Sequence, residues 1–227
     1  MAITIRAYRL DDRDAVRHIC YQTGYMGSPI APQWADEPSF ANLFTSYYTD
    51  NEPQSTIVAE RNGIVVGYLL GCRDTEQSTR PSRIFLQQVV TRLIAFRPGT
   101  AGFVRRSIGD TATGLLRHEM MEDRFIDSRW PAHLHINLLP EARGQGGGTK
   151  LVRRWLDQLE RDGVSGCHLE TVAENVDAIA FFASCGFERR GSPQRAPGLR
   201  APDGTRHSVQ LMVRNLSGRA ESGEIPR

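Results

Sequence analysis

Alternating apolar and polar positions open the chain and predict a strand over residues 3–8. Two aspartates then precede apolar side chains at helical spacing over residues 15–20, which indicates a helix capped at its N-terminus. Residues 24–38 carry two glycines and three prolines and are expected to form a loop or a broken helix. Helical spacing returns over residues 40–48.

The next segment has the signature of a β-hairpin. Residues 55–60 and 64–72 are rich in β-branched and apolar side chains, and Asn62-Gly63 lies between them. An Asn-Gly pair between two such runs favours a tight hairpin turn. Residues 73–129 change to helical periodicity, so we expect a mostly helical insertion there.

Strands and helices alternate in the second half of the chain. The pattern predicts strands at 133–139, 167–172, 187–190 and 208–214, and helices at 149–161 and 176–184. Residues 191–207, rich in Pro, Gly and Arg, are expected to form a long loop. The order of elements predicts a mixed α/β sheet in a single domain.

Composition and charge narrow the classes of function. The 227 residues carry 28 basic and 26 acidic side chains, a formal net charge of +2, so no global field draws the chain to nucleic acid or to a membrane. The four cysteines, Cys20, Cys72, Cys167 and Cys185, are far apart, which argues against a disulfide framework or a metal site. No run reaches the roughly 20 apolar residues of a membrane span. We therefore expect a soluble, cytoplasmic protein without a metal ion.

A glycine-rich segment between a predicted strand and a predicted helix is a candidate phosphate loop. Its residues are Arg143, Gly144, Gln145, Gly146, Gly147 and Gly148, followed by Thr149. The first amides of a helix are unpaired and carry partial positive charge, and glycines let the backbone curl around phosphate oxygens. A Walker loop and the GxGxxG fingerprint both require glycine where Thr149 stands. The pattern [RQ]-x-x-G-x-[GA] is met by Arg143, Gly146 and Gly148.

The segment downstream of this loop completes a two-block pattern. Asn175 is followed at fixed spacing by Ala178, Phe181, Phe182, Gly186 and Phe187. Together the two blocks resemble the GNAT (Gcn5-related N-acetyltransferase) superfamily over residues 132–187. The resemblance implies an α/β (α+β) fold: a mixed, mostly antiparallel sheet with a splayed central strand and flanking helices. We expect one such domain over residues 1–216, a helical insertion at about 74–129 between the third and fourth strands, and a flexible tail at 217–227.

The resemblance also implies a cosubstrate, acetyl-CoA, and residues that bind it. The loop from Arg143 through Gln145 to Thr149 would hold the pyrophosphate, and the amides of Leu138 and Leu139 would face the pantetheine arm and the thioester. Asn175 would bind near the pantetheine; the alternative role is to cap the helix that follows it, and both roles can hold at once. The tyrosine that the family offers as general acid is replaced here by Phe182, which has no hydroxyl group.

Candidate bases lie on the strand before the loop. His133, His135 and Asn137 alternate with apolar residues and so share one face; the two histidines are proposed as bases, and Asn137 as a substrate contact. Some members of the superfamily that act on small amines carry a similar His-x-His. A pair of partly buried, hydrogen-bonded histidines is the alternative. Glu170 on the neighbouring strand is a further candidate base, acting through a water molecule.

Two other segments are candidates for contact with the acceptor. Tyr25 and Trp34 lie in the broken region that lines the acceptor cleft in GNAT proteins, although packing is the alternative role. Four basic side chains on or beside the late loop would attract an acidic acceptor or the coenzyme phosphates, unless that loop is simply solvated: Arg195, Arg200, Arg206 and His207.

A narrower resemblance comes from the opening residues, the hairpin and the long insertion. These are similar to bacterial acetyltransferase-like proteins related to the C-terminal domain of human O-GlcNAcase, a domain regarded as a pseudo-acetyltransferase. Two functions follow: an N-acetyltransferase for an unidentified amine or protein acceptor, or a non-catalytic acetyl-CoA-binding module. A nucleotide-binding protein unrelated to coenzyme A is a third. The added helices offer surface for a homodimer.

Overall fold

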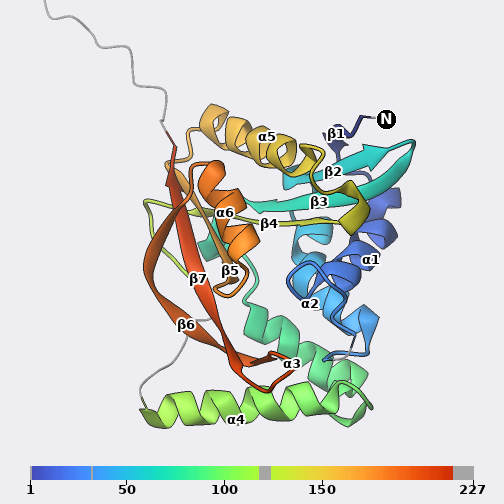
Figure 1. The fold of residues 1–227 in the computed structure, drawn as a ribbon, viewed down its shortest axis with the longest axis vertical. Helices are drawn as coiled ribbons and strands as arrows, with labels where there is room; N and C mark the ends of the chain where they lie inside the picture. The colour runs from blue at the N-terminus through green and yellow to red at the C-terminus, as the bar shows by residue number, and fades with distance from the viewer. Residues whose placement is uncertain (1, 32, 118–123, 217–227) are drawn as a thin grey trace, which may run out of the picture.

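The computed structural model describes residues 2–31, 33–117 and 124–216, and in this part of the chain the strands form one seven-stranded sheet in the order β1-β2-β3-β4-β5-β7-β6 (Figure 1). Every neighbouring pair is antiparallel except β4 and β5, which confirms the mixed sheet. The strands are β1 (Thr4–Ala7), β2 (Thr56–Arg61), β3 (Ile64–Cys72), β4 (Ala132–Leu138), β5 (Gly166–Val172), β6 (Glu188–Arg200) and β7 (Arg206–Asn215). The helices are α1 (Arg13–Thr23), α2 (Glu37–Asp50), α3 (Pro81–Arg92), α4 (Ala101–Arg117), α5 (Gly147–Arg161) and α6 (Val176–Ser184).

The predicted hairpin is confirmed between β2 and β3. Asn62 and Gly63 form its turn with positive φ angles of 56° and 79°, the left-handed conformation that Asn and Gly tolerate best. β1 pairs with β2 and completes an antiparallel meander at this edge of the sheet.

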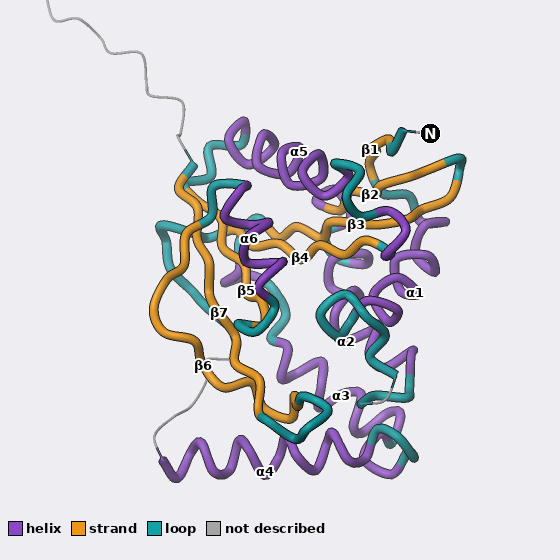
Figure 2. Tube along the Cα trace, viewed as in Figure 1, coloured by secondary structure: helices purple, strands orange, loops and turns teal. Residues whose placement is uncertain are grey.

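Two apolar cores lie on opposite faces of the sheet, as the helix positions in Figure 2 indicate. One core packs the apolar stripe of α5, centred on the fully buried Trp155, and the inner residues of α6. The other packs α1, α2 and the insertion around Trp34 and Tyr68. No helix in the described ranges is long and apolar enough to cross a membrane.

The central parallel pair, β4 and β5, opens along its length. The two strands are paired only at Ala132–Cys167 and His133–His168, although they continue to Leu138 and Val172. The predicted splayed strand is therefore confirmed. We call the opening between β4 and β5 beyond His133 and His168 the splay. Helix α5 connects the two strands, so the N-termini of α5 and α6 lie at the open end of the splay.

The insertion is helical, as predicted, and it supports the far end of the sheet. α4 lies along the outer end of β6 (Figure 1). A Cβ atom on Gly198 would lie 2.0 Å from Ser107 Oγ, so only glycine allows this approach between β6 and α4.

The prediction of a long loop over residues 191–207 is wrong, because most of this segment belongs to β6 and β7. β6 shifts register between Arg190 and Gln194 and again between Arg195 and Arg200. Glycine and proline are tolerated in an edge strand and at such irregularities, because a missing amide hydrogen there breaks no ladder bond. We refer to the outer part of β6 and β7, residues 195–207, as the arm. The tail predicted at residues 217–227 lies outside the described residues.

Candidate active site

The glycine-rich segment turns tightly at the open end of the splay. A 3-10 helix (Pro140–Ala142) leads into it, Gly144 and Gly146 have φ angles of 70° and 74°, and Gly146 caps α5. The helix begins at Gly147, two residues before the predicted start. A Cβ atom on Gly144 or Gly146 would meet nothing within 4 Å, so both lie open to an approaching ligand.

The first turn of α5 presents backbone donors at this open surface. The first helical bond runs from Lys150 N to Gly146 O at 3.1 Å, and no side chain caps this end among the described residues. The amides of Gly147, Gly148 and Thr149 therefore have no helical acceptor. With the helix dipole they form a site for an anion such as a phosphate group.

The Arg143 side chain ties two segments of backbone together. Its guanidinium donates to Leu138 O from Nε at 3.0 Å and Nη2 at 2.9 Å, and to Gly27 O from Nη2 at 2.5 Å. It thus holds the turn after α1 against the end of β4. The positive charge of Arg143 thus offsets the partial negative charge of the Leu138 and Gly27 carbonyl oxygens at the open end of the splay.

The two leucines at the end of β4 do not present their amides alike. Leu139 N donates to Val66 O of β3 at 2.9 Å, so the prediction that this amide faces the splay is wrong. Amides of successive residues in a strand point to opposite sides, so the Leu138 N–H points toward β5. Because the pairing of β4 with β5 ends at His133, the Leu138 amide lies where the two strands have separated.

His133 is bonded at both ring nitrogens. Nε2 lies 2.8 Å from Tyr48 Oη, and Nδ1 lies 2.7 Å from Thr75 Oγ1, whose hydroxyl also donates to Pro131 O. A carbonyl can only accept, so the hydroxyl proton is used there, Nδ1 carries the ring proton, and Nε2 accepts from Tyr48. Burial, with the neighbouring histidines, lowers the pKa of His133 well below its usual value. His133 is therefore a structural histidine, which corrects its assignment as a base.

His135 and His168 both pack against the ring of His133. The His135 ring packs edge-on against Tyr48 and His133, and burial with the charge of His168 lowers its pKa to about 4. His168 is buried, and its Nδ1 lies 2.8 Å from Trp130 O. His135 is thus neutral at neutral pH, and its low pKa makes it a weak base for an amine.

The other predicted residues on and around the sheet have these surroundings. Trp34 is 1% exposed and donates from Nε1 to Ser39 Oγ, so it is a core residue and the prediction of a substrate contact is wrong. Asn137 donates from Nδ2 to Thr23 Oγ1 and so helps to hold α1 on β4. Glu170 lies exposed on β5, opposite Leu211 of β7 in the register.

A chain of three polar side chains crosses the acceptor side of the splay. Tyr25 Oη lies 2.9 Å from His207 Nε2, and His207 Nδ1 lies 3.1 Å from Glu174 Oε2. The sequence suggested Tyr25 and His207 separately and did not indicate Glu174. No local spacing links them, because 182 residues separate Tyr25 from His207.

The arm is held in place by ion pairs to the insertion. Arg200 and Arg206 both contact Asp110 of α4, at 2.6 and 2.7 Å. Gln33 accepts from Arg200 N and donates to Arg200 O, which fixes the segment after α1 to the arm. These two arginines therefore serve the structure, and the expectation that they attract a ligand is not supported by their contacts.

The second motif block begins with a helix cap. Asn175 Oδ1 accepts from Ala178 N at 3.2 Å and caps α6, the role that was the alternative to coenzyme contact. Phe182 is 6% exposed and packs against Phe181 and Phe187 in the core below α5 and α6. Its position supplies no proton donor.

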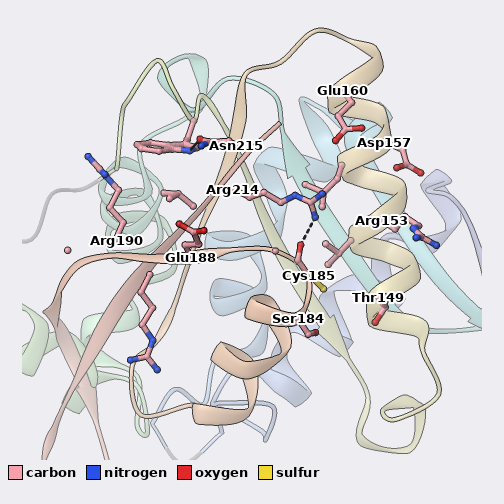
Figure 3. Close-up of a pocket in the computed structure, with 17 residues that line it drawn as sticks. Thr149, Arg153, Asp157, Glu160, Ser184, Cys185, Glu188, Arg190, Arg214 and Asn215 are labelled. Carbon is pink, nitrogen blue, oxygen red and sulfur yellow. Dashed lines mark hydrogen bonds between the residues drawn. The ribbon is translucent and has the colours of Figure 1, made fainter. Parts of the chain in front are cut away.

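A separate groove of about 1010 Å³ lies between α5, the end of α6, and the inner parts of β6 and β7 (Figure 3). Arg153, Asp157 and Glu160 of α5 border it, and Arg214 donates to Cys185 O across its floor (Figure 3). Thr149 links it to the glycine-rich segment. Both signs of charge are spread around its rim, so it has no focus for one ionic ligand.

Comparison with known proteins matches this arrangement to one family. The model of the acetyltransferase (GNAT) family matches residues 21–187. The crystal structure of SsHAT has 28% sequence identity and a TM-score of 0.65, with 96% of this chain and 100% of that chain covered. The ribosomal-protein-S18-alanine N-acetyltransferase from Escherichia coli has 20% identity and a TM-score of 0.55, with coverage of 98% and 99%. A phosphinothricin acetyltransferase from Sinorhizobium meliloti, in complex with AcCoA, has 19% identity and a TM-score of 0.57, with coverage of 100% and 95%.

Proposed function

The chain belongs to the acetyltransferase (GNAT) family, and on this premise we propose that it transfers the acetyl group of acetyl-CoA to an amine. One observation carries the proposal: the sheet opens between β4 and β5, and the uncapped N-terminus of α5 stands at the opening. The opening offers a slot for an extended thioester arm. The helix end offers donors for its pyrophosphate.

The residues present fit that ligand at three points. The open surface at Gly144 and Gly146 admits phosphate oxygens to the amides of the first turn of α5. We expect the Leu138 amide to donate to the thioester carbonyl, where negative charge develops as the amine attacks; its direction toward the separated strand β5 supports this. Asn175 borders the opening as the cap of α6.

A second candidate function rests on Phe182. This side chain occupies the position of the family's usual tyrosine and is buried in an apolar core. That substitution favours a protein that binds acetyl-CoA without transferring its acetyl group, as the narrower resemblance to the O-GlcNAcase C-terminal domain also suggests. The thiolate of coenzyme A is itself a tolerable leaving group, because a free thiol has a pKa of about 8.5, so transfer does not require a tyrosine there.

Calorimetry and turnover distinguish these functions. We expect binding of acetyl-CoA and CoA but not of ATP; absence of acetyl-CoA binding at millimolar concentration would refute both candidates. Release of free thiol should then be measured across polyamines, aminoglycosides, aminosugars and lysine peptides. A rate above acetyl-CoA hydrolysis on any acceptor establishes transfer, whereas hydrolysis alone on all of them favours the binding protein.

We also propose that the insertion mediates homodimer formation. Large apolar side chains are exposed along it: Leu86, Val90, Leu93, Phe96, Ile108, Leu115 and Leu116. Seven exposed apolar side chains on one insertion favour an interaction surface over chance exposure. Light scattering should give a dimer mass for the wild type and a monomer mass for Val90→Arg combined with Phe96→Arg; a monomeric wild type contradicts the proposal.

A further inference from the structure

The Tyr25–His207–Glu174 chain has a defined direction of hydrogen bonding. Glu174 also accepts from Ser208 N, at 3.2 and 3.3 Å. Burial opposes ionisation of Glu174, but hydrogen bonds from the backbone and from His207 outweigh it and lower the pKa of the carboxyl group. An ionised carboxylate only accepts, so Nδ1 of His207 carries the proton, and Nε2 accepts from the Tyr25 hydroxyl.

This chain spans the mouth of the splay from one strand to the other. On the β4 side, the residues flanking Tyr25 are tied down: Thr23 accepts from Asn137, and Gly27 O shares the Arg143 guanidinium with Leu138 O. On the β5 side, Glu174 follows the end of the strand, where Ala173 N donates to Ser208 O at 2.8 Å. The chain of hydrogen bonds therefore joins a segment tied to the end of β4 with the segment that follows β5.

The surroundings hold the chain in a fixed geometry. Tyr25 and Ser28 exchange two backbone hydrogen bonds of 2.8 Å, which makes a tight turn. His207 is 4% exposed, and its ring packs against that of Tyr25 with centroids 5.7 Å apart. Fixed donors and acceptors of this kind favour proton transfer, because no reorganisation is needed at the moment of reaction.

We propose that Tyr25 is a catalytic residue that carries protons during acetyl transfer, with His207 and Glu174 as its positioning residues. The proposal rests on the proposed function and assigns the proton transfer that Phe182 cannot perform. Of the other titratable groups at the splay, His133 is bonded at both nitrogens, the lowered pKa of His135 makes it a weak base, and Glu170 lies exposed on β5.

In this reaction the proton lost by the amine is replaced by one that the thiolate gains. The amine nitrogen bonds to the carbonyl carbon, its proton passes to the Tyr25 oxygen, and the phenol proton passes at the same time to His207 Nε2. The resulting imidazolium is paired with Glu174. When the carbon–sulfur bond breaks, its electron pair leaves with sulfur, and a proton returns from His207 through Tyr25 to the thiolate, giving an amide and free coenzyme A. Burial raises the pKa of Tyr25, which keeps it a phenol before and after the step.

Two substitutions separate proton transfer from mere packing. Tyr25→Phe keeps the ring and removes the hydroxyl; His207→Gln keeps an amide oxygen that accepts from Tyr25 but cannot take up a proton. General acid–base catalysis contributes about 10²- to 10⁴-fold, so we expect both variants to lower kcat by about 100-fold or more, with the KM for acetyl-CoA unchanged. Tyr47→Phe is the matched control, because the Tyr47 hydroxyl donates to Glu52, which follows α2, and takes no part in the Tyr25–His207–Glu174 chain.

Failure of the Tyr25 proposal can be told apart from failure of the proposed acetyl transfer. Wild-type binding of acetyl-CoA and turnover of an amine from the panel test that function alone. Wild-type kcat in Tyr25→Phe overturns the catalytic role of Tyr25, and wild-type kcat in His207→Gln shows that the bond only holds the turn. Nitrogen-15 NMR gives a test that needs no acceptor: the His207 proton is expected on Nδ1, and a proton on Nε2 in the neutral ring would overturn the relay.

Discussion

The two sides of the splayed sheet are built in different ways. The coenzyme side, the surface proposed to bind acetyl-CoA, presents backbone amides from one short segment, residues 143–149. The acceptor side, the surface proposed to meet the amine, presents side chains from residues 25, 174 and 207, which three separate parts of the chain bring together. A backbone site needs glycines at set positions and so leaves a motif, whereas a side-chain site depends on tertiary structure.

Gly146→Glu, which alters the coenzyme side alone, should have the largest effect on the affinity for acetyl-CoA. The added carboxylate would stand at the N-terminus of α5, where it repels phosphate and blocks the turn, so we expect acetyl-CoA binding to be abolished in calorimetry. Gly163→Glu is the control at the other end of the same helix, with a similar φ of 72° and open surroundings. Equal loss in both variants would contradict the assignment and indicate strain instead.

The second prediction concerns His135 and the free energy of unfolding of the protein at low pH. His135 has a pKa of about 4 in the fold, against 6.5 in the unfolded chain. Below pH 6.5 the unfolded state takes up a proton that the folded state does not, so stability falls as the pH drops toward 4. His135→Phe should remove about 2–3 kcal/mol of this loss between pH 7.5 and 4.5, measured by urea unfolding. Parallel pH profiles for variant and wild type would refute this.

Asp110→Asn tests whether the acceptor side depends on the arm. Asp110 pairs with Arg200 and Arg206, and loss of its charge should destabilise the fold by about 2 kcal/mol. It should also lower kcat, because His207 adjoins Arg206. Asp127→Asn is the control, since that carboxylate pairs with Arg129, a neighbour two residues away in the sequence. Loss of acetyl-CoA affinity in Asp110→Asn would show that the two sides are not independent.

The smallest effect is expected from the cap of α6. Asn175→Ala removes the bond to Ala178 N and should cost about 1 kcal/mol in thermal unfolding. Asn175→Ser can restore a cap without the amide group. Acetyl-CoA affinity that falls in both variants would mean that the Asn175 amide also contacts the ligand, whereas stability equal to wild type in Asn175→Ala would contradict the cap.

Local patterns made the coenzyme side predictable. The hairpin at Asn62-Gly63, the glycine turn and the order of elements over residues 132–187 depend on residues close in sequence, and the structure has them as expected. The start of α5 was placed two residues late, because Gly147 and Gly148 are weak helix formers that this turn nevertheless brings into the helix.

The features that the sequence does not predict depend on contacts between residues far apart in the chain. Trp34 is buried because the insertion packs over it, with Phe103 at 5.0 Å between ring centroids. The arm extends because α4 supports an edge strand that its glycines and prolines would otherwise interrupt. Strand register decides that Leu139 bonds to Val66, which composition does not reveal. For the same reason, Glu174 could not be linked to His207 from the sequence.

The distance along the chain between Tyr25 and His207 has a consequence for biosynthesis. During translation, every residue of the coenzyme side has been joined by Phe187, while His207 is added 20 residues later. A nascent chain that ends after α6 therefore contains every residue of the glycine-rich turn but lacks His207 of the proposed relay. The proposed acceptor side can form only after Arg206–Asn215, the residues of β7, have been synthesised.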